Sequence, residues 1–317
     1  MRTIEQLLEI IQAGRASRSD LYGLSNLSQS QARQVWTVCA RLPVASRRAV
    51  TRALVEITES DFEVNFCEIL RLALEDEDAE VRRAAVEGLW EDEDVRLVPM
   101  LAARLLEDPV VEVRAAAATS LGRFLLLGEL GKLRARPYNK VLQTLLAACK
   151  GEESVEVRRR ALESLAYSAT KAVVDLIRAA YQDPDERMQV SAIFAMGRSA
   201  DERWAAEVAR ELHSANPQMR YEAAHACGEL ALEETVPVLI ELVGDVDVEV
   251  QEAAIWALGQ IGGDEARQTL EVCARSNDEA LREAAREALR ELEFLHGDLG
   301  TFLLFDFLEE EGEGEEE

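Results

Sequence analysis

The side chains that most often carry out catalysis or bind metals are few and scattered in this sequence. The three histidines, His213, His225 and His296, are not followed by glutamate, and no two have the spacing of paired metal ligands. The five cysteines form no CxxC pair. The motifs GxxxxGK[ST], GxGxxG and GxSxG, which bind phosphates or activate a serine, are absent from the sequence. We therefore expect no catalytic residue, no metal ligand and no bound cofactor.

The charge balance limits the kind of partner. The 317 residues include 61 Asp and Glu against 35 Lys and Arg, a formal net charge of -26. Such a field repels nucleic acid and anionic membrane surfaces and favours a basic or mixed-charge protein partner. The sequence lacks the run of about 18 apolar residues that a membrane span needs, and its amphipathic start does not resemble a signal peptide. We expect a cytoplasmic protein with reduced cysteines.

An internal repeat predicts the architecture. Seven segments share apolar residues at offsets 0, 3 or 4, 7 and 8, which form one face of a helix. An amphipathic stretch precedes each segment, so the repeating unit is helix, turn, helix. Neither helix can bury its apolar face alone, and the units must therefore stack. The segments begin at Val81, Val113, Val157, Met188, Met219, Val250 and Leu281, and the last five starts are 31 residues apart.

Polar residues and glycines recur at fixed positions of the repeat. Side-chain oxygens three residues before the first apolar position can accept hydrogen bonds from the free backbone donors of a helix start. These expected N-cap residues are Asp78, Ser154, Asp185, Asn216, Asp247 and Asp278, with Val110 as the exception. Glycines recur nine residues after the first apolar position, which we interpret as helix ends. They are Gly122, Gly197, Gly228 and Gly259.

The pattern Asp, four residues, Val-Arg, two residues, Ala, ending in Leu-Gly, resembles the HEAT-repeat family. It is most similar to the short bacterial repeats also found in phycobilisome-lyase-like proteins. The resemblance implies an all-α, right-handed α-α superhelix, with a ladder of Asp and Arg residues between neighbouring repeats. Pro99 and Pro237 match the proline that the family often has in its first helix. Arg82, Arg114, Arg158, Arg220 and Arg282 fit the ladder, whereas Gln189 and Gln251 depart from it.

The resemblance also suggests activities to compare with these residues. HEAT-like deoxyhypusine hydroxylases bind iron through His-Glu pairs, and HEAT-like DNA glycosylases use basic surfaces; this sequence has neither. Bilin lyases share the short repeat, but no set of residues here demands their chemistry. We expect a non-catalytic scaffold or adaptor that binds another protein. The alternative is a bilin-lyase-like or other small-molecule enzyme on the same fold, and the oligomeric state is unknown from the sequence.

Three segments depart from the repeat. Residues 1–42 are expected to form a helical cap before a repeat array at 43–294, and an insert near 124–140 forms a lengthened loop or helix. Residues 295–317 join the apolar run 302-FLLFDFL to a Glu-rich tail that should be disordered. The run either caps the last repeat or presents a short motif to another protein. The insert holds a basic cluster that could bind a phosphate or form a solvated loop: Lys132, Arg134, Arg136 and Lys140.

The second helix of each unit is expected to line the inner, concave surface, where solenoids usually bind their partners. Three successive repeats have Phe194, His225 and Trp256 at the same offset, with Val190 and Tyr221 one turn away. We expect these five residues to form an apolar, aromatic patch that anchors a partner. In the alternative interpretation, tight curvature or the C-terminal apolar run already covers them.

Overall fold

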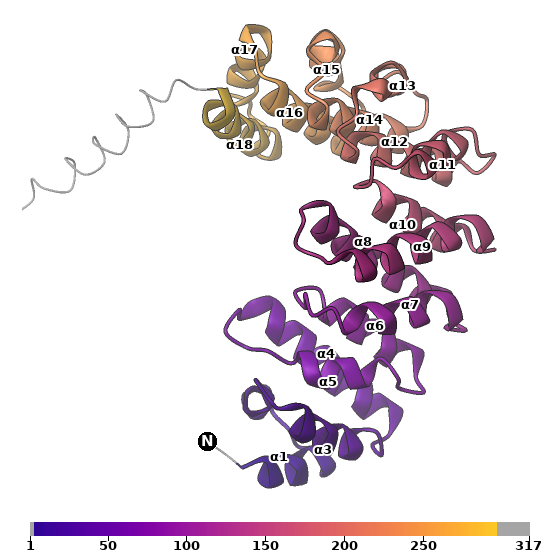
Figure 1. The fold of residues 1–317 in the computed structure, drawn as a ribbon. Coiled ribbons are helices and arrows are strands. Elements are labelled where there is room, and N and C mark those ends of the chain that lie inside the picture. Colours follow the sequence, from indigo (N-terminus) through magenta and orange to yellow (C-terminus); the bar gives the residue numbers. More distant parts are fainter. Residues whose placement is uncertain (1–2, 297–317) are drawn as a thin grey trace, which may run out of the picture. The chain divides into compact units, whose positions relative to one another are not determined.

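The computed structural model describes residues 3–296, and every regular element in that range is a helix (Figure 1). Contacts divide the chain into two compact units, which we call unit 1 (Met1–Leu176) and unit 2 (Ile177–Glu317). Helix α11 (Lys171–Tyr181) spans the division. The fold is an α-α solenoid, as the repeat predicts.

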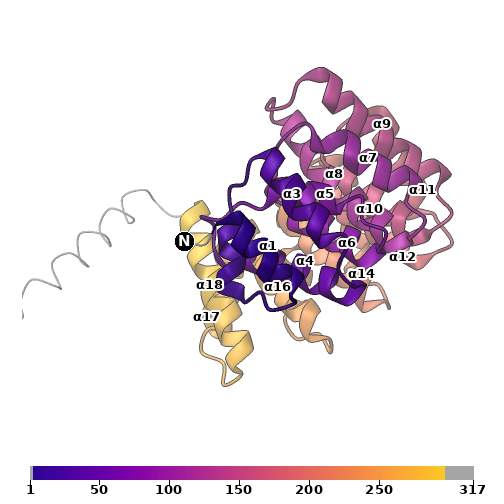
Figure 2. The same ribbon diagram turned by 90° about the horizontal axis from the view of Figure 1, so that it is seen from below.

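Helices in unit 1 alternate between two rows. The first helices are α1 (Ile4–Gln12), α3 (Gln29–Cys39), α5 (Cys67–Ala73), α7 (Leu97–Glu107) and α9 (Ala135–Gly151). The second helices are α2 (Arg18–Leu21), followed by the short 3-10 helix Tyr22–Leu24, then α4 (Val44–Ser60), α6 (Ala79–Gly88), α8 (Val111–Glu129) and α10 (Val155–Leu165). Helix α4 contacts α6, α6 contacts α8, and α8 contacts α10. In the other row, α3 packs beside α5 and α7 beside α9 (Figures 1 and 2).

Unit 2 repeats the same alternation. Its first helices are α13 (Ala205–Glu211), α15 (Val236–Leu242) and α17 (Asp264–Cys273), and the 3-10 helices Glu202–Trp204 and Glu233–Thr235 lead into α13 and α15. Its second helices are α12 (Glu186–Arg198), α14 (Pro217–Glu229), α16 (Val248–Ile261) and α18 (Glu279–His296). The second helices contact one another in the order α12, α14, α16, α18, and α17 packs against α18 (Figures 1 and 2).

The expected N-cap residues do stand at the starts of the second helices. The side chains of Asp78, Asp185, Asn216 and Asp247 each accept a backbone N–H from two or three residues further on. Ser154 is also an N-cap residue, but its side chain makes no capping bond, so its predicted contribution is wrong. Each side-chain cap stabilises its helix by about 1 kcal/mol.

The Asp and Arg ladder connects consecutive second helices in unit 1. Arg82 donates from Nε and Nη2 to the Asp108 carboxylate at 2.7 and 2.8 Å, and from Nη1 to the Asp76 carbonyl at 2.8 Å. Arg114 repeats the arrangement with Glu152 at 2.9 and 3.0 Å and the Asp108 carbonyl at 2.8 Å. Each arginine therefore binds the loop of its own repeat and the carboxylate of the next.

In unit 2, Arg220 forms the same pair with Asp245, at 2.7 and 2.8 Å. The two glutamines keep only the local half of the contact: Gln189 Nε2 donates to the Asp183 carbonyl at 2.8 Å, and Gln251 makes the equivalent bond. The next repeat in each case has serine where the others have a carboxylate, namely Ser214 and Ser276. Where glutamine replaces the ladder arginine, serine therefore replaces the carboxylate of the next repeat that the arginine would bind.

Three of the recurring glycines, Gly197, Gly228 and Gly259, lie in the last turn of their helices, as interpreted, whereas Gly122 lies inside α8. None of the four adopts the positive φ of a helix-ending glycine, so their position has another cause. A Cβ at Gly197 would lie 2.7 Å from the Cα of Ala226, and one at Gly228 would lie 2.6 Å from the ring of Trp256. At Gly259 it would lie 2.8 Å from a backbone oxygen of α18. Glycine recurs here because the next second helix approaches too closely for any side chain.

The N-terminal residues continue the alternation. Helix α3 contacts α5 and α4 contacts α6, so the alternating rows already include the helices before the first of the seven repeat segments. Arg47 on α4 forms the first rung of the ladder, with Nε 3.0 Å from an oxygen of Asp76 and Nη1 donating to the Leu42 carbonyl. The boundary expected at residue 42 stays a prediction.

The insert lengthens two helices. Helix α8 has 19 residues and α9 has 17, and the basic cluster is divided between their short connection (Lys132 and Arg134) and the first turns of α9 (Arg136 and Lys140). The apolar run 302–308 and the acidic tail at 309–317 lie outside the described residues.

Candidate functional site

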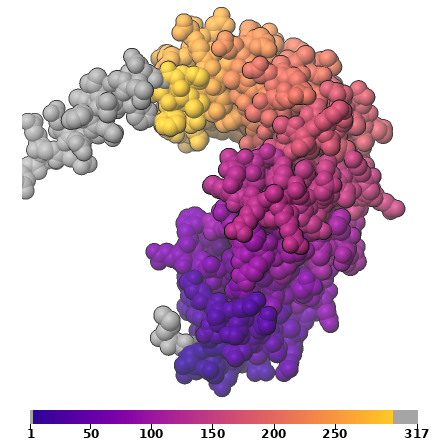
Figure 3. Space-filling view, in the orientation of Figure 1, coloured from indigo at the N-terminus to yellow at the C-terminus, as the bar shows by residue number. Residues whose placement is uncertain are grey.

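The second helices of unit 2 form a groove at their surface, which we call the aromatic groove. It has a volume of about 550 Å³. Figure 3 shows the surface of this unit, coloured from pink to yellow, with α18 in yellow. Small residues on α18, Ala284 and Ala288, leave space beside the larger side chains of α14 and α16. The polar and aromatic residues that line it are Tyr221, His225, Glu252, Trp256, Gln260, Glu287 and Glu291.

Three of the five predicted patch residues meet in this groove. The rings of Tyr221 and His225 lie 4.7 Å apart in an edge-on arrangement, and those of His225 and Trp256 lie 4.7 Å apart with a tilt of 39°. The helical repeat brings equivalent positions of neighbouring second helices side by side. All three rings remain partly exposed. They form a continuous aromatic surface over α14 and α16.

Phe194 lines a smaller pocket of about 150 Å³ that shares Tyr221 and His225 with the aromatic groove. The guanidinium of Arg198 lies over the Phe194 ring, 5.6 Å from its centroid. Its Nε also lies 3.1 Å from a carboxylate oxygen of Glu229. We call this the Phe194 pocket. It extends the aromatic surface onto α12, and the ion pair of Arg198 and Glu229 lies at its edge.

Val190 does not belong to this surface. Only 6% of the residue is exposed, because its side chain faces into the packing of α12 rather than into the groove. The structure therefore does not bring Val190 to the aromatic surface, and its contact with a partner stays an untested prediction. Sequence offset alone missed several other lining residues, among them Arg198, Glu229, Gln260 and Glu291. These four lie one turn beyond the aromatic positions, so the same repeat register contains them.

The electrostatics of the groove favour a neutral histidine. Burial lowers the pKa of His225, and the positive charge of Arg198 lowers it further. Burial raises the pKa of Glu229, and Arg198 partly offsets that effect. Burial also raises the pKa of the Tyr221 hydroxyl, together with nearby carboxylates such as Glu252. The lowered pKa favours the neutral form of His225, and the carboxylates of Glu252, Glu287 and Glu291 make the groove acidic.

The predicted basic cluster lies in the α8–α9 connection and at the start of α9. All four residues, Lys132, Arg134, Arg136 and Lys140, are exposed, and within residues 3–296 they make no ion pair. The structure therefore places the four basic side chains at the surface, and their binding of a phosphate stays a prediction.

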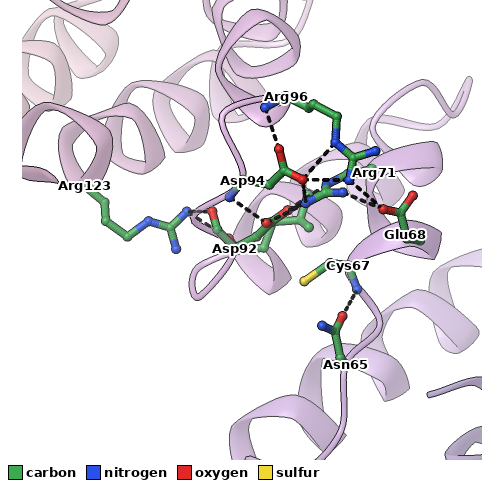
Figure 4. Close-up of polar contacts among 9 residues, drawn as sticks. Asn65, Cys67, Glu68, Arg71, Asp92, Asp94, Arg96 and Arg123 are labelled. Atoms are coloured by element: carbon green, nitrogen blue, oxygen red, sulfur yellow. Dashed lines mark hydrogen bonds and ion pairs between the residues drawn. The ribbon is translucent and has the colours of Figure 1, made fainter. Parts of the chain in front are cut away.

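A second polar cluster lies in unit 1 between α5 and the loop after α6 (Figure 4). The Arg71 guanidinium donates to the Asp92 carboxylate at 2.6 and 2.7 Å and to Glu68 at 2.7 Å. Arg96 bridges Glu68 and Asp94, and its hydrogen bond lowers the pKa of the Asp94 carboxyl to about 2. Each charged side chain in the cluster pairs with an opposite charge, which fits a structural role in joining neighbouring repeats. We call this cluster of ion pairs the staple.

Arg123 and Cys67 border this staple (Figure 4). Arg123 Nη2 donates to the carbonyls of Leu89 and Asp92 at 3.1 and 2.7 Å. Burial raises the pKa of the Cys67 thiol to about 11, so the thiolate is scarce at neutral pH. All five cysteines are free in the structure. The staple offers no activated nucleophile.

Two further findings concern the part of the chain that the structure describes. Among residues 3–296 no group of three or more His, Cys, Asp or Glu side chains could hold a metal ion. None of the helices described is both long and apolar enough to cross a membrane.

The stacked helical hairpins, the ladder and the groove on the second helices define a helical-repeat solenoid. The HEAT-repeat family matches residues 67–138, 142–212 and 205–290, which is well over half of the sequence. The chain belongs to the HEAT-repeat family. A search among curated proteins found no match.

Solved structures share this fold at low sequence identity. Yeast importin-beta (Kap95p) is similar over 90% of this chain and 46% of its own, at 14% identity and a TM-score of 0.55. The complex of CpcE and CpcF of phycocyanin lyase from Nostoc sp. PCC7120 is similar over 70% of this chain and 86% of its own, at 18% identity and a TM-score of 0.51. The chain thus spans less than half the length of the importin, and the likenesses concern the fold.

Proposed function

We propose that this chain is a non-catalytic scaffold or adaptor that holds another protein against the aromatic groove. The observation that carries the proposal is the continuous, partly exposed surface of Tyr221, His225 and Trp256 beside a groove of about 550 Å³. Aromatic side chains supply large contact areas at low entropic cost, and a polar rim around them is typical of interaction hot spots.

The shape of the groove supports a polypeptide as its occupant. Its length runs across α14, α16 and α18, and the Phe194 pocket continues it to α12. Neighbouring helices pack about 8–10 Å apart, so three helix-to-helix steps extend over roughly 25–30 Å. That length suits a short extended segment or one helix of a partner.

The ladder supports a binding function in a second way. In unit 2 it pairs charges with little exposure within the scaffold itself, as in the Arg220–Asp245 pair. A scaffold with satisfied internal charges keeps its second-helix face in place without a ligand. Partner binding then costs little reorganisation.

Affinity capture with two matched variants tests the proposal. One variant carries Phe194→Ala, Tyr221→Ala and Trp256→Ala. The control removes the same three residue types from exposed positions in unit 1: Tyr22→Ala, Phe62→Ala and Trp90→Ala. Circular dichroism and thermal melting establish that all proteins fold. A protein retained by the wild type and the control, but lost by the groove variant, supports the proposal.

Equal retention by both variants contradicts the groove as the binding site. The remaining candidate is a bilin-lyase-like or other small-molecule enzyme, which shares the fold. It predicts a different result from the same purification: a coloured chromophore bound to the chain, visible by absorbance, with no protein retained.

A further inference from the structure

The aromatic groove is asymmetric in charge along its length. At the α12–α14 end, Arg198 neutralises Glu229 at 3.1 Å. At the α16–α18 end, Glu252, Glu287 and Glu291 line the groove and form no ion pair with any of residues 3–296. Neighbouring carboxylates outside the groove do find partners, such as Glu283 with Arg286 at 2.9 Å. The groove therefore combines an aromatic floor with uncompensated negative charge at one end.

Trp256 stands at the centre of this charged end. His225 and Gly228 of α14 flank its ring on one side, and the small residues Ala284 and Ala288 of α18 line the groove on the other. The residues on α18 are too small to cover the ring. A planar cation can therefore lie over the indole while its N–H groups reach carboxylates on both α16 and α18.

We infer that the aromatic groove recognises an arginine-bearing segment of a partner protein, with the guanidinium over Trp256 and bonded to Glu252, Glu287 and Glu291. This inference rests on the proposed function and names the chemistry of its partner. Arginine fits better than lysine because its flat guanidinium stacks on an aromatic ring and donates bidentate bonds to carboxylates. The neutral state of His225 adds no positive charge that would repel it.

The Phe194 pocket supplies a second subsite for the same segment, in which Phe194 and Ala226 offer apolar surface beside the Arg198–Glu229 pair. Its volume of about 150 Å³ suits one apolar side chain such as leucine. Phe194 and Trp256 lie on second helices two steps apart, roughly 16–20 Å at the usual helix spacing. An extended chain covers that distance in about five or six residues. The expected segment therefore carries an arginine about five or six residues from an apolar anchor.

Peptide display on the full chain tests this inference. Peptides that bind the wild-type chain are selected from a random library of twelve-residue sequences. The Kd of each selected peptide is then measured by fluorescence anisotropy on the wild type and on three variants. The first carries Glu252→Gln, Glu287→Gln and Glu291→Gln. The second, a charge-matched control on the first helices of the same unit, carries Glu207→Gln, Glu241→Gln and Glu271→Gln. The third carries the groove substitutions at Phe194, Tyr221 and Trp256.

We expect selected peptides to share an arginine and an apolar residue at this spacing. Their affinity should fall at least tenfold on the first variant and less than twofold on the control. Replacing the peptide arginine with lysine should weaken binding, and glutamine should weaken it more.

Other outcomes separate the two proposals. Peptides without a basic residue, or an equal Kd on the first variant and the control, overturn the arginine site. If these peptides still lose affinity on the third variant, the proposed function stands. No enriched peptide, or peptides that bind the third variant as well as the wild type, overturn both. Tighter peptide binding after deletion of residues 297–317 identifies the chain's own C-terminal segment as the occupant and also overturns the inference.

Discussion

The Arg82–Asp108 rung offers the sharpest test of how the repeats are held together. Both side chains are buried, with 7% and 0% of their surfaces exposed, and two hydrogen bonds of 2.7 and 2.8 Å join them. We predict that Arg82→Gln keeps the local bond to the Asp76 carbonyl, because Gln189 makes the equivalent bond in its own repeat. The substitution therefore removes mainly the pairing with the buried carboxylate.

The expected cost follows from what remains around Asp108. Removing one partner of a buried ion pair costs about 3–5 kcal/mol, because the other charge stays buried. Asp108 would still accept the Val110 N–H at 3.0 Å and retain Arg104 at 3.5 Å. We therefore expect a loss near the lower end, about 3 kcal/mol in the free energy of unfolding.

Urea unfolding followed by circular dichroism measures this loss. The control is Arg83→Gln, which removes a half-exposed arginine on the same helix that lies 3.7 Å from Glu87. A surface pair of this kind contributes less than about 1 kcal/mol. Combining Arg82→Gln with Asp108→Asn should recover part of the loss, since no unpaired charge is then buried. A loss for Arg82→Gln no greater than that of the control would refute the reasoning.

The same rung makes stability depend on pH. Burial would raise the pKa of Asp108, but the hydrogen bonds from Arg82 and Val110 outweigh it and leave the pKa lowered. A lowered pKa in the folded state means that the stabilisation is complete above the unfolded pKa, about 3.9. It is lost as the pH falls through the folded value. In Arg82→Gln this acid-dependent loss should be smaller.

Three more predictions concern individual side chains. Gly228→Ala should destabilise the chain by about 1–3 kcal/mol in urea unfolding and displace Trp256, because the new Cβ would lie 2.6 Å from the indole ring; a wild-type midpoint would contradict this close packing. Arg198→Gln should raise the pKa of His225 in an NMR titration, since the guanidinium charge contributes to lowering it; an unchanged pKa would assign the whole effect to burial. Cys149 should react slowly with iodoacetamide at pH 8 in the folded chain, because burial raises its pKa to about 12, and fast labelling would contradict that burial.

The repeat register predicted much of this fold. Apolar spacing located the second helices, and the polar residue before each one located its start, as at Asp185 and Asn216. These features are local, so a single sequence contains them. It was harder to predict which N-terminal helices are the first and which are the second helices of a repeat, because α4 lacks the full Val-Arg pattern. Arg47 was the remaining signal, and its contact with Asp76 shows that it continues the ladder.

The aromatic floor could be predicted but the groove could not. The common offset of His225 and Trp256 placed the two rings on neighbouring helices, and the structure brings them to 4.7 Å. The depth of the groove depends on Ala284 and Ala288, whose small size matters only once α18 packs beside α16. The close contact of Gly228 with Trp256 could not be predicted for a similar reason, since close approach between repeats is not visible within one repeat.

The measurement that tests the binding groove most directly is site-specific photo-cross-linking in the native cells. A benzophenone amino acid replaces Ala284, which lines the aromatic groove, or Ala206, which is exposed on α13 in the other row of the same unit. The proposed function predicts a covalent adduct with one protein from position 284 and none from position 206. Adducts from both positions alike, or from position 206 alone, would contradict it.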